Sequence, residues 1–303
     1  IFKMASTGKG MILHYSRKGV PLGHPFTEQN VEKCENFKFR ENDVLIVGYP
    51  KSGNTWLQEM TWLVLNDGDT EGAKNSSIMS RAPLMESIFP GQPAFVDKLE
   101  EIPGSRLMNT HLPNVFLKDG LEKGRPKVIV VMRNPKDLVV SYFHFYNTRP
   151  GRCIPDFNDF FAKFMEGSLL FGSYFDFCSN WYHHQGDDNF LFLTYEDMKK
   201  DHHGTVRDIA KFLGRNLTND QVERIVDFTS FKSMKDRPQA KVNKSEETDK
   251  SKKDKAKIGS GSFFRKGEVG DWKNTMSIDQ SKQIDQRVRD VLEPVGLNFT
   301  FEL

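Results

Sequence analysis

Cysteine is scarce in this sequence. Among 303 residues there are only three cysteines, Cys34, Cys153 and Cys178, and they lie far apart with no CxxC pair. Disulfide scaffolds carry many paired cysteines, and structural zinc sites carry cysteines at short, fixed spacings. The sequence therefore argues against both, and we expect a protein of a reducing compartment, the cytoplasm.

Long apolar runs are lacking as well. No stretch approaches the roughly 20 apolar residues that a transmembrane helix needs, so we expect no membrane contact. The first ten residues, IFKMASTGKG, contain no apolar core of a secretory signal. We expect residues 1–14 to be an N-terminal tail and residues 15–303 to form a single domain.

An excess of one charge is also missing. The 43 Lys and Arg residues oppose 41 Asp and Glu residues, which gives a net charge of +2. Nucleic-acid-binding domains usually carry a strong basic surplus, so we expect no nucleic-acid partner and only local basic sites. Residues 241–262 are rich in Lys and Ser and nearly free of apolar side chains. This composition predicts a mobile loop, since the segment cannot bury enough surface to offset the entropy of ordering.

The apolar residues that are present predict an α/β fold. Continuous apolar runs, typical of buried strands, lie at 43–48 and 127–132, and NFLFLTYED (189–197) repeats the pattern of a strand followed by a polar turn. Apolar residues at helical spacing predict helices at 54–67, 134–147, 202–214, 218–229 and 279–296. Strands that alternate with helices favour a central parallel β-sheet flanked by helices.

The segment GYPKSGNTW (48–56) follows the first predicted strand and opens a helix. Backbone N–H groups of such a turn, together with the helix dipole, bind anions. Gly48 and Gly53 have the spacing of the two glycines in a phosphate-binding P-loop, but Asn54 occupies the position of its lysine. The lysine here is Lys51, inside the loop, so its charge should reach a different oxygen. We therefore predict a P-loop-like site for a phosphate or a related anion.

Two further segments carry cations suited to phosphate. Arg133 ends the predicted strand at 127–132, where a P-loop kinase would place an acid that helps to hold Mg²⁺. A guanidinium grips phosphate in a bidentate manner and binds no metal, and Ser141 can add a hydroxyl donor. In FFRKGEVGDWK (263–273), Arg265 and Lys266 precede Gly267, whose backbone can approach an anion closely.

Together these segments resemble the cytosolic sulfotransferase family, which uses 3′-phosphoadenosine 5′-phosphosulfate (PAPS). The family sequence YPKSGTTW is YPKSGNTW here, an Arg and a Ser eight residues apart are matched by Arg133 and Ser141, and RKGxxGDWK is matched at 265–273. The similarity runs from about residue 15 to the end. It implies metal-free, in-line transfer of a sulfuryl group to a hydroxyl or amine of a small molecule, leaving 3′-phosphoadenosine 5′-phosphate (PAP).

The resemblance also implies the donor site. The loop residues would bind the 5′ side and the adenine: Lys51, Ser52, Gly53, Asn54, Thr55 and Trp56. The 3′-phosphate would be held by Arg133, Ser141, Arg265, Lys266 and Gly267. Further nucleotide contacts, mostly to the adenine, would come from Tyr195, Thr229, Phe231 and Phe264.

His111, in RLMNTHLP (106–113), matches the catalytic base of the family motif KTHLP. The reaction asks for such a group, because an acceptor hydroxyl must lose its proton as it attacks sulfur, and an imidazole with a near-neutral pKa suits that work. Lys51 would stabilise the charge that builds on the departing 5′-phosphate. The candidate catalytic residues are therefore His111, Lys51 and Ser141.

Three positions depart from the family pattern. Asn109 stands where the family usually has Lys, which removes one cation near the transferred group. Asn54 replaces Thr, although its amide also donates hydrogen bonds. The family dimer segment KxxxTVxxxE is altered to KNTMSIDQSK (273–282), which weakens the case for the family's homodimer. We expect the adjacent pairs His183-His184 and His202-His203 to be surface or core residues and poor metal ligands.

Two other functions stay open at this point. A P-loop kinase or NTPase would require Mg²⁺, which the positions of Asn54 and Arg133 disfavour. A non-catalytic nucleotide sensor would lack turnover. The acceptor class is not determined, and phenols, steroids, other alcohols and amines are all compatible. Lining residues are suggested only by rough position, at Phe26, Phe89, Phe145 and Tyr146.

Overall fold

The computed structural model describes residues 14–88, 91–148, 154–237 and 264–303. Its centre is a sheet of four parallel strands in the order β4-β3-β5-β6. The strands are β3 (Val44–Val47), β4 (Leu107–Thr110), β5 (Lys127–Met132) and β6 (Phe190–Thr194). The predicted parallel sheet is confirmed, and β4 joins it as a fourth strand.

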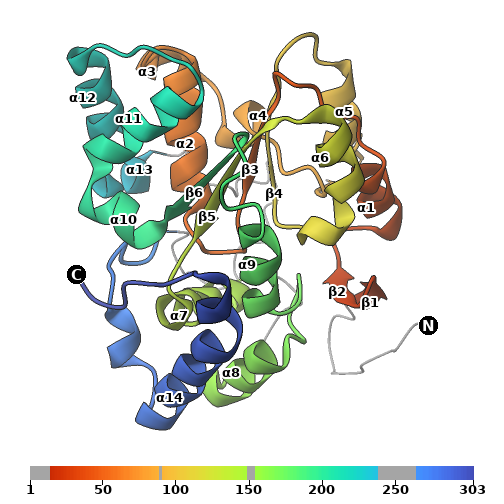
Figure 1. The fold of residues 1–303 in the computed structure, drawn as a ribbon, viewed down its shortest axis with the longest axis vertical. Helices are drawn as coiled ribbons and strands as arrows, with labels where there is room; N and C mark the ends of the chain where they lie inside the picture. The colour runs from red at the N-terminus through yellow and green to blue at the C-terminus, as the bar shows by residue number, and fades with distance from the viewer. Residues whose placement is uncertain (1–13, 89–90, 149–153, 238–263) are drawn as a thin grey trace, which may run out of the picture.

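Helices cover both faces of this sheet (Figure 1). On one side lie α2 (Asn54–Leu65), α3 (Thr70–Asn75), α10 (Tyr195–Lys200), α11 (His202–Phe212), α12 (Asn219–Phe228) and α13 (Phe231–Asp236). On the other lie α1 (Glu28–Glu35), α5 (Phe95–Glu101) and α6 (Lys118–Gly124). Strand β3 serves both layers, since Val44 and Ile46 pack with α2, α11 and α12, whereas Leu45 and Val47 belong to the other core.

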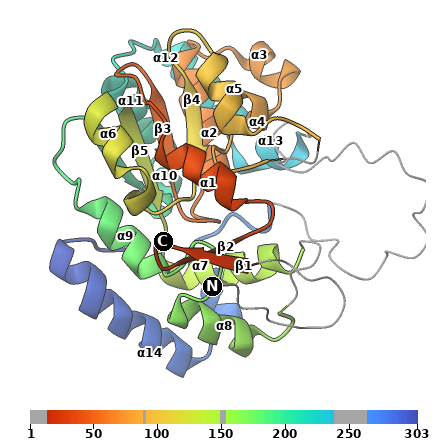
Figure 2. The ribbon, with the colours of Figure 1, turned by 90° about the vertical axis from the view of Figure 1, so that its right-hand side faces the viewer.

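A third group of helices lies below the sheet in Figures 1 and 2. It comprises α7 (Pro135–Tyr146), α8 (Phe157–Glu166), α9 (Tyr174–Tyr182) and α14 (Ile278–Arg287). The other elements are the antiparallel hairpin β1 (His14–Arg17) and β2 (Val20–Gly23), α4 (Ile78–Arg81), and short helical turns at 114–116, 271–274, 288–292 and 293–295.

Helix starts follow the sequence closely. Asn134 caps α7 by accepting a hydrogen bond from the Asp137 N–H at 2.8 Å, and Pro135 occupies the first turn. The strand and polar turn predicted within 189–197 are β6 and the start of α10, which Thr194 caps by accepting from the Asp197 N–H. The C-terminal helix is shorter than predicted and continues as π and 3-10 turns to Val295.

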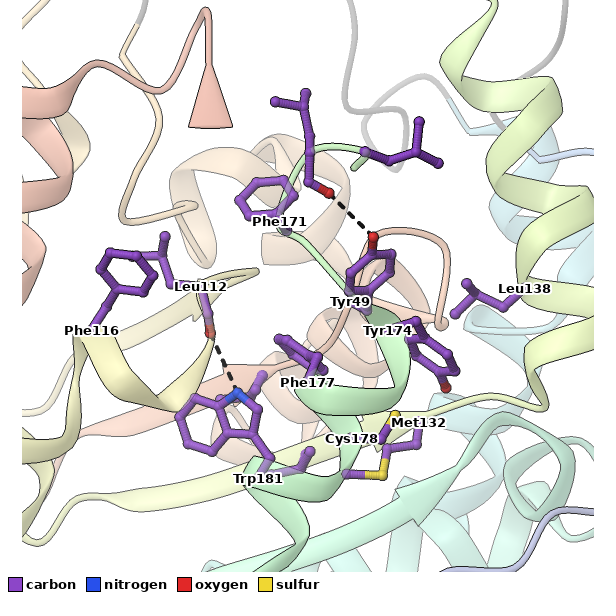
Figure 3. Packing of buried hydrophobic residues seen from close by; sticks show 14 of the residues in the cluster. Tyr49, Leu112, Phe116, Met132, Leu138, Phe171, Tyr174, Phe177, Cys178 and Trp181 are labelled. Atoms are coloured by element: carbon purple, nitrogen blue, oxygen red, sulfur yellow. Dashed lines mark hydrogen bonds between the residues drawn. The ribbon is translucent and has the colours of Figure 1, made fainter. Parts of the chain in front are cut away.

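Aromatic packing fixes the two segments that leave β3 and β4 (Figure 3). Tyr49, directly after β3, donates from its hydroxyl to the carbonyl of Gly172 at 2.8 Å. Trp181 donates from its indole N–H to the carbonyl of Leu112, which follows β4, at 3.3 Å. Both rings are fully buried. The backbone segments that leave the carboxyl ends of β3 and β4 are therefore fixed by side chains of the buried core.

Two sequence predictions fall outside the described residues, the loop at 241–262 and, apart from His14, the tail at 1–14. Within the described ranges, no helix has both the length and the apolar character required to cross a bilayer.

Candidate active site

A cavity of about 730 Å³ opens at the carboxyl ends of the strands. Strands β3 and β5 are neighbours, but β3 leads to β4 on one side and β5 leads to β6 on the other. Ligands in open α/β sheets bind at such a switch point, where the following segments diverge. The cavity is lined by the loop after β3, by residues after β4 and β5, and by 264–267 from the C-terminal part of the chain.

The loop after β3 places backbone groups and the cationic side chain of Lys51 at one wall of the cavity. Gly53 directly precedes α2 with a φ of 112°, and a Cβ there would lie 2.9 Å from the Tyr195 ring, so the close approach requires glycine. Lys51 also adopts a positive φ, 73°, a strained conformation for a residue with a side chain. Its ammonium lies 4.7 Å from the centre of the Phe145 ring. Lys51 lines the cavity.

Two side chains of this loop turn inward, those of Asn54, which also lines the cavity, and Ser52. The Asn54 amide donates to the carbonyls of Tyr49 at 2.9 Å and Gly48 at 3.2 Å, so both side-chain protons serve the loop itself. Ser52 is fully buried and is not among the residues that line the cavity. Its Oγ has no hydrogen-bond partner within the described residues. Thr55 and Trp56 line the cavity as well.

Arg133 links two of the predicted segments. Its guanidinium donates to the carbonyls of Lys51 at 3.4 Å and Glu268 at 3.1 Å, and it stacks over the Tyr195 ring at 4.2 Å. Its Nε is buried and has no partner in the described part of the chain. Ser141 lines the same cavity from α7. The end of β5 thus presents a cation with one donor still to be satisfied.

Arg265 and Lys266 converge on one carboxylate, Asp271, at 2.5 Å each. Burial alone would raise the pKa of Asp271, but hydrogen bonds from Lys266, Asn274 and Arg265 outweigh it and hold the pKa at about 2. Asp271 is therefore an anion that holds both cations beside the cavity that they line.

Gly267 fixes the adjoining backbone. Its φ is 72°, and a Cβ there would lie 2.3 Å from the Phe231 ring. Phe231 in turn meets Phe264 edge to face, with ring centres 6.3 Å apart. These rings line the cavity together with Trp56, Tyr195 and Thr229. The residues predicted to contact the adenine are therefore brought together in one wall.

His111 follows β4 and is half-buried on the cavity wall. Its Nδ1 lies 2.5 Å from the carbonyl oxygen of Gly48. A carbonyl can only accept, so Nδ1 carries the proton and Nε2 keeps its lone pair. Burial and the charge of Lys51, partly opposed by the Gly48 hydrogen bond, lower the pKa of His111 to about 4. The near-neutral value expected from the sequence is thus lowered, and the ring is neutral at neutral pH.

The backbone of His111 is held by a carboxyl group that the sequence did not suggest. Glu86 is fully buried and accepts from the His111 N–H at 2.7 Å and from the Thr110 hydroxyl at 3.0 Å. Burial raises the pKa of Glu86 to about 7, although these hydrogen bonds oppose the shift. Asn109 occupies the position at which the family usually has a lysine. Its amide donates to the carbonyl of Ala82 at 2.5 Å and links the segment around Ala82 to β4.

The rest of the cavity is mainly apolar. Of the residues suggested as lining, Phe26 and Phe145 line it, Tyr146 is buried elsewhere, and Phe89 falls outside the described residues. Apolar neighbours that sequence reasoning missed are Pro25, Met79, Leu84, Ile88 and Phe171. Two histidines were also missed, His24 and His202. No local sequence signal marks them, because they reach the wall only through the packing of distant segments.

Comparison with known proteins agrees with this geometry. Residues 41–296 match the family model described as the sulfotransferase domain. The chain is 38% identical to rat sulfotransferase 1C2 and 35% identical to human sulfotransferase 1C2, over 94% and 93% of this chain and 94% of each relative. It superimposes with a TM-score of 0.74 on the mouse sulfotransferase SULT7A1, solved in complex with PAP, at 27% identity over 92% of this chain and 95% of that one. The chain therefore belongs to the sulfotransferase family, whose members transfer a sulfuryl group from PAPS to small-molecule acceptors.

Proposed function

We propose that the cavity binds PAPS through the residues assembled at the ends of β3 and β5, and that His111 and Lys51 pass its sulfuryl group to a small hydroxyl or amine. The observation that carries this proposal is convergence. Residues from three segments distant in the sequence, at 51–56, 133–141 and 264–267, line one cavity together with His111. The mouse relative was solved with PAP, the product of the same donor.

The chemistry of the wall fits a nucleotide with two anionic groups. The buried Nε atoms of Arg133 and Arg265 have no partner within the described ranges, so each retains a donor for an oxygen. Gly267, which has no Cβ, lets the Phe231 ring of the wall pack directly against the backbone. Trp56, Tyr195 and Phe231 offer flat faces and edges for a base. PAPS, when bound, supplies the electrophilic sulfur and the leaving 5′-phosphate.

The transfer balances without a metal. Nε2 of His111 accepts the proton of the acceptor hydroxyl as its oxygen bonds to sulfur. The bond between sulfur and the bridging oxygen breaks, and that oxygen takes the electron pair. The Lys51 ammonium stabilises this charge, and Ser141 adds a hydroxyl donor near the phosphates. The positive φ of Lys51 and the Gly48 contact of His111 support these roles.

Calorimetry tests the donor site directly. PAP should bind far more tightly than AMP, and Arg265→Ala should weaken PAP at least about tenfold, because each charge-assisted contact contributes roughly 1.5–3 kcal/mol. The loss should be specific to PAP, since AMP lacks the 3′-phosphate. Equal affinities for PAP and AMP in the unmodified protein would contradict the assignment.

Turnover separates this function from its alternatives. With labelled PAPS and a panel of phenols, steroids, aliphatic alcohols and amines, at least one acceptor should be sulfated, and EDTA should leave the rate unchanged. His111→Ala should abolish turnover while PAP affinity is largely retained. A sensor would bind PAP without turnover, and a kinase would require metal and ATP. The cytoplasmic location expected from the sequence stays a prediction, and the question of a homodimer stays open.

A further inference from the structure

One polar group on the nucleotide wall has no part in the proposed transfer, the imidazole of His202. It is the first residue of α11 and lines the cavity beside Trp56, Tyr195 and Thr229. Its ring meets the Trp56 ring edge to face, with centres 5.0 Å apart. The packing of α11 against α2 brings it to this position (Figure 1).

The hydrogen bonds around His202 determine which nitrogen carries its proton. Nε2 lies 2.9 Å from Oγ1 of Thr229. That hydroxyl donates its single proton to the carbonyl of Ile225, at 2.7 Å. Thr229 can therefore only accept from His202, and Nε2 must be the protonated nitrogen. Burial, with smaller effects of His203 and Lys199, lowers the pKa of His202 to about 4, so the neutral ring keeps a lone pair on Nδ1.

A neutral acceptor of this kind, beside aromatic rings suited to a purine, matches one edge of adenine. Adenine presents an exocyclic amino group as a donor at position 6, whereas hypoxanthine and guanine present an oxygen there. We propose that Nδ1 of His202 accepts a hydrogen bond from this amino group and makes His202 the residue that selects adenine over 6-oxopurines. The inference rests on the proposed donor site.

Two substitutions separate the two nitrogens. His202→Gln places an amide nitrogen near the position of Nε2, so it can still donate to Thr229 but offers no acceptor near Nδ1. His202→Asn places an amide oxygen near Nδ1 and loses the bond to Thr229. His203→Asn is the matched control, because the neighbouring ring is exposed and pairs with Glu223 at 3.0 Å. Thermal denaturation of each variant checks that it folds.

The probes are PAP and its inosine counterpart, 3′-phosphoinosine 5′-phosphate, measured by calorimetry. The unmodified protein should prefer PAP by about tenfold or more. In the inosine nucleotide the hydrogen bond from the amino group to Nδ1 is lost, and the oxygen at position 6 faces the Nδ1 lone pair instead. His202→Gln should lose most of this preference through weaker PAP binding, while His202→Asn and His203→Asn keep it.

A preference unchanged in His202→Gln would overturn the proposal. An equal loss for both probes in both His202 variants would also overturn it, because the residue would then only support Thr229. These outcomes differ from a failure of the donor site itself, in which the unmodified protein would not distinguish PAP from AMP.

Discussion

The imidazole of His111 is constrained from two directions, and this makes its behaviour testable. Gly48 accepts from Nδ1, which leaves Nε2 as the basic atom, and Glu86 holds the backbone N–H. The sequence predicted His111 as a candidate base from its motif. It could not predict Glu86, because the contact joins residues 25 positions apart through the pairing of Leu84 with Asn109 at the edge of β4.

The lowered pKa of His111 gives a pH prediction with a definite sign. The neutral ring is the working form, and burial with Lys51 holds its pKa at about 4. Turnover at saturating donor should therefore persist as the pH falls through about 6.5, where a solvated imidazole would become protonated, and should decline only toward pH 4. The measurement is kcat against pH for an acceptor that does not titrate, and an inflection near 6.5 would contradict it.

Glu86 predicts a graded series. Glu86→Ala leaves the His111 N–H buried without its acceptor, so kcat should fall by more than about tenfold. Glu86→Gln retains a carbonyl oxygen for that N–H and should lose much less. Both variants should bind PAP nearly as the unmodified protein does, because Glu86 does not line the cavity. A parallel loss of kcat and PAP affinity would indicate a general structural role instead.

At the scale of elements, the short sequence motifs predicted where strands, loops and helices lie, but not which way the side chains of a loop point. The strand, loop and helix at 43–67 formed as predicted, since local hydrogen bonds and turn geometry determine them. Asn54 turned its amide inward to Gly48 and Tyr49, and Ser52 lies in the interior. Side-chain direction within a tight loop depends on what the rest of the fold packs around it, which a one-dimensional pattern does not contain.

The turn at 264–271 offers a matched glycine pair. Gly267 and Gly270 both have positive φ, so alanine at either should cost about 1 kcal/mol of stability. Only at Gly267 would the new Cβ collide with Phe231, whereas at Gly270 its nearest neighbour would be 3.7 Å away. Gly267→Ala should therefore weaken PAP binding at least about tenfold beyond Gly270→Ala. Equal affinities of the two variants would show that Phe231 is not part of the nucleotide wall.

At the scale of the whole molecule, the sheet order decides which distant segments meet. The sequence predicted parallel strands and helices on both faces, but not that β3 would lie between β4 and β5. This order brings Lys51, His111 and Arg133 to one edge. His202 and His24 reach the same cavity through the packing of a helix and of the hairpin. The periodicity of a sequence predicts which face of a helix or strand is buried, but not which other element packs against that face.

Because the donor site draws on segments from residue 51 to residue 267, nucleotide binding should stabilise the entire fold. A ligand bound only by the native state at 100 times its Kd contributes about 2.7 kcal/mol. For a chain of this length each kcal/mol corresponds to roughly 2 °C, so saturating PAP should raise the Tm by about 5 °C. ADP carries comparable negative charge without a 3′-phosphate and should raise it much less at the same concentration. Arg265→Ala should remove most of the difference between the two nucleotides, and equal shifts for PAP and ADP in the unmodified protein would mean that charge alone, rather than a 3′-phosphate site, is responsible.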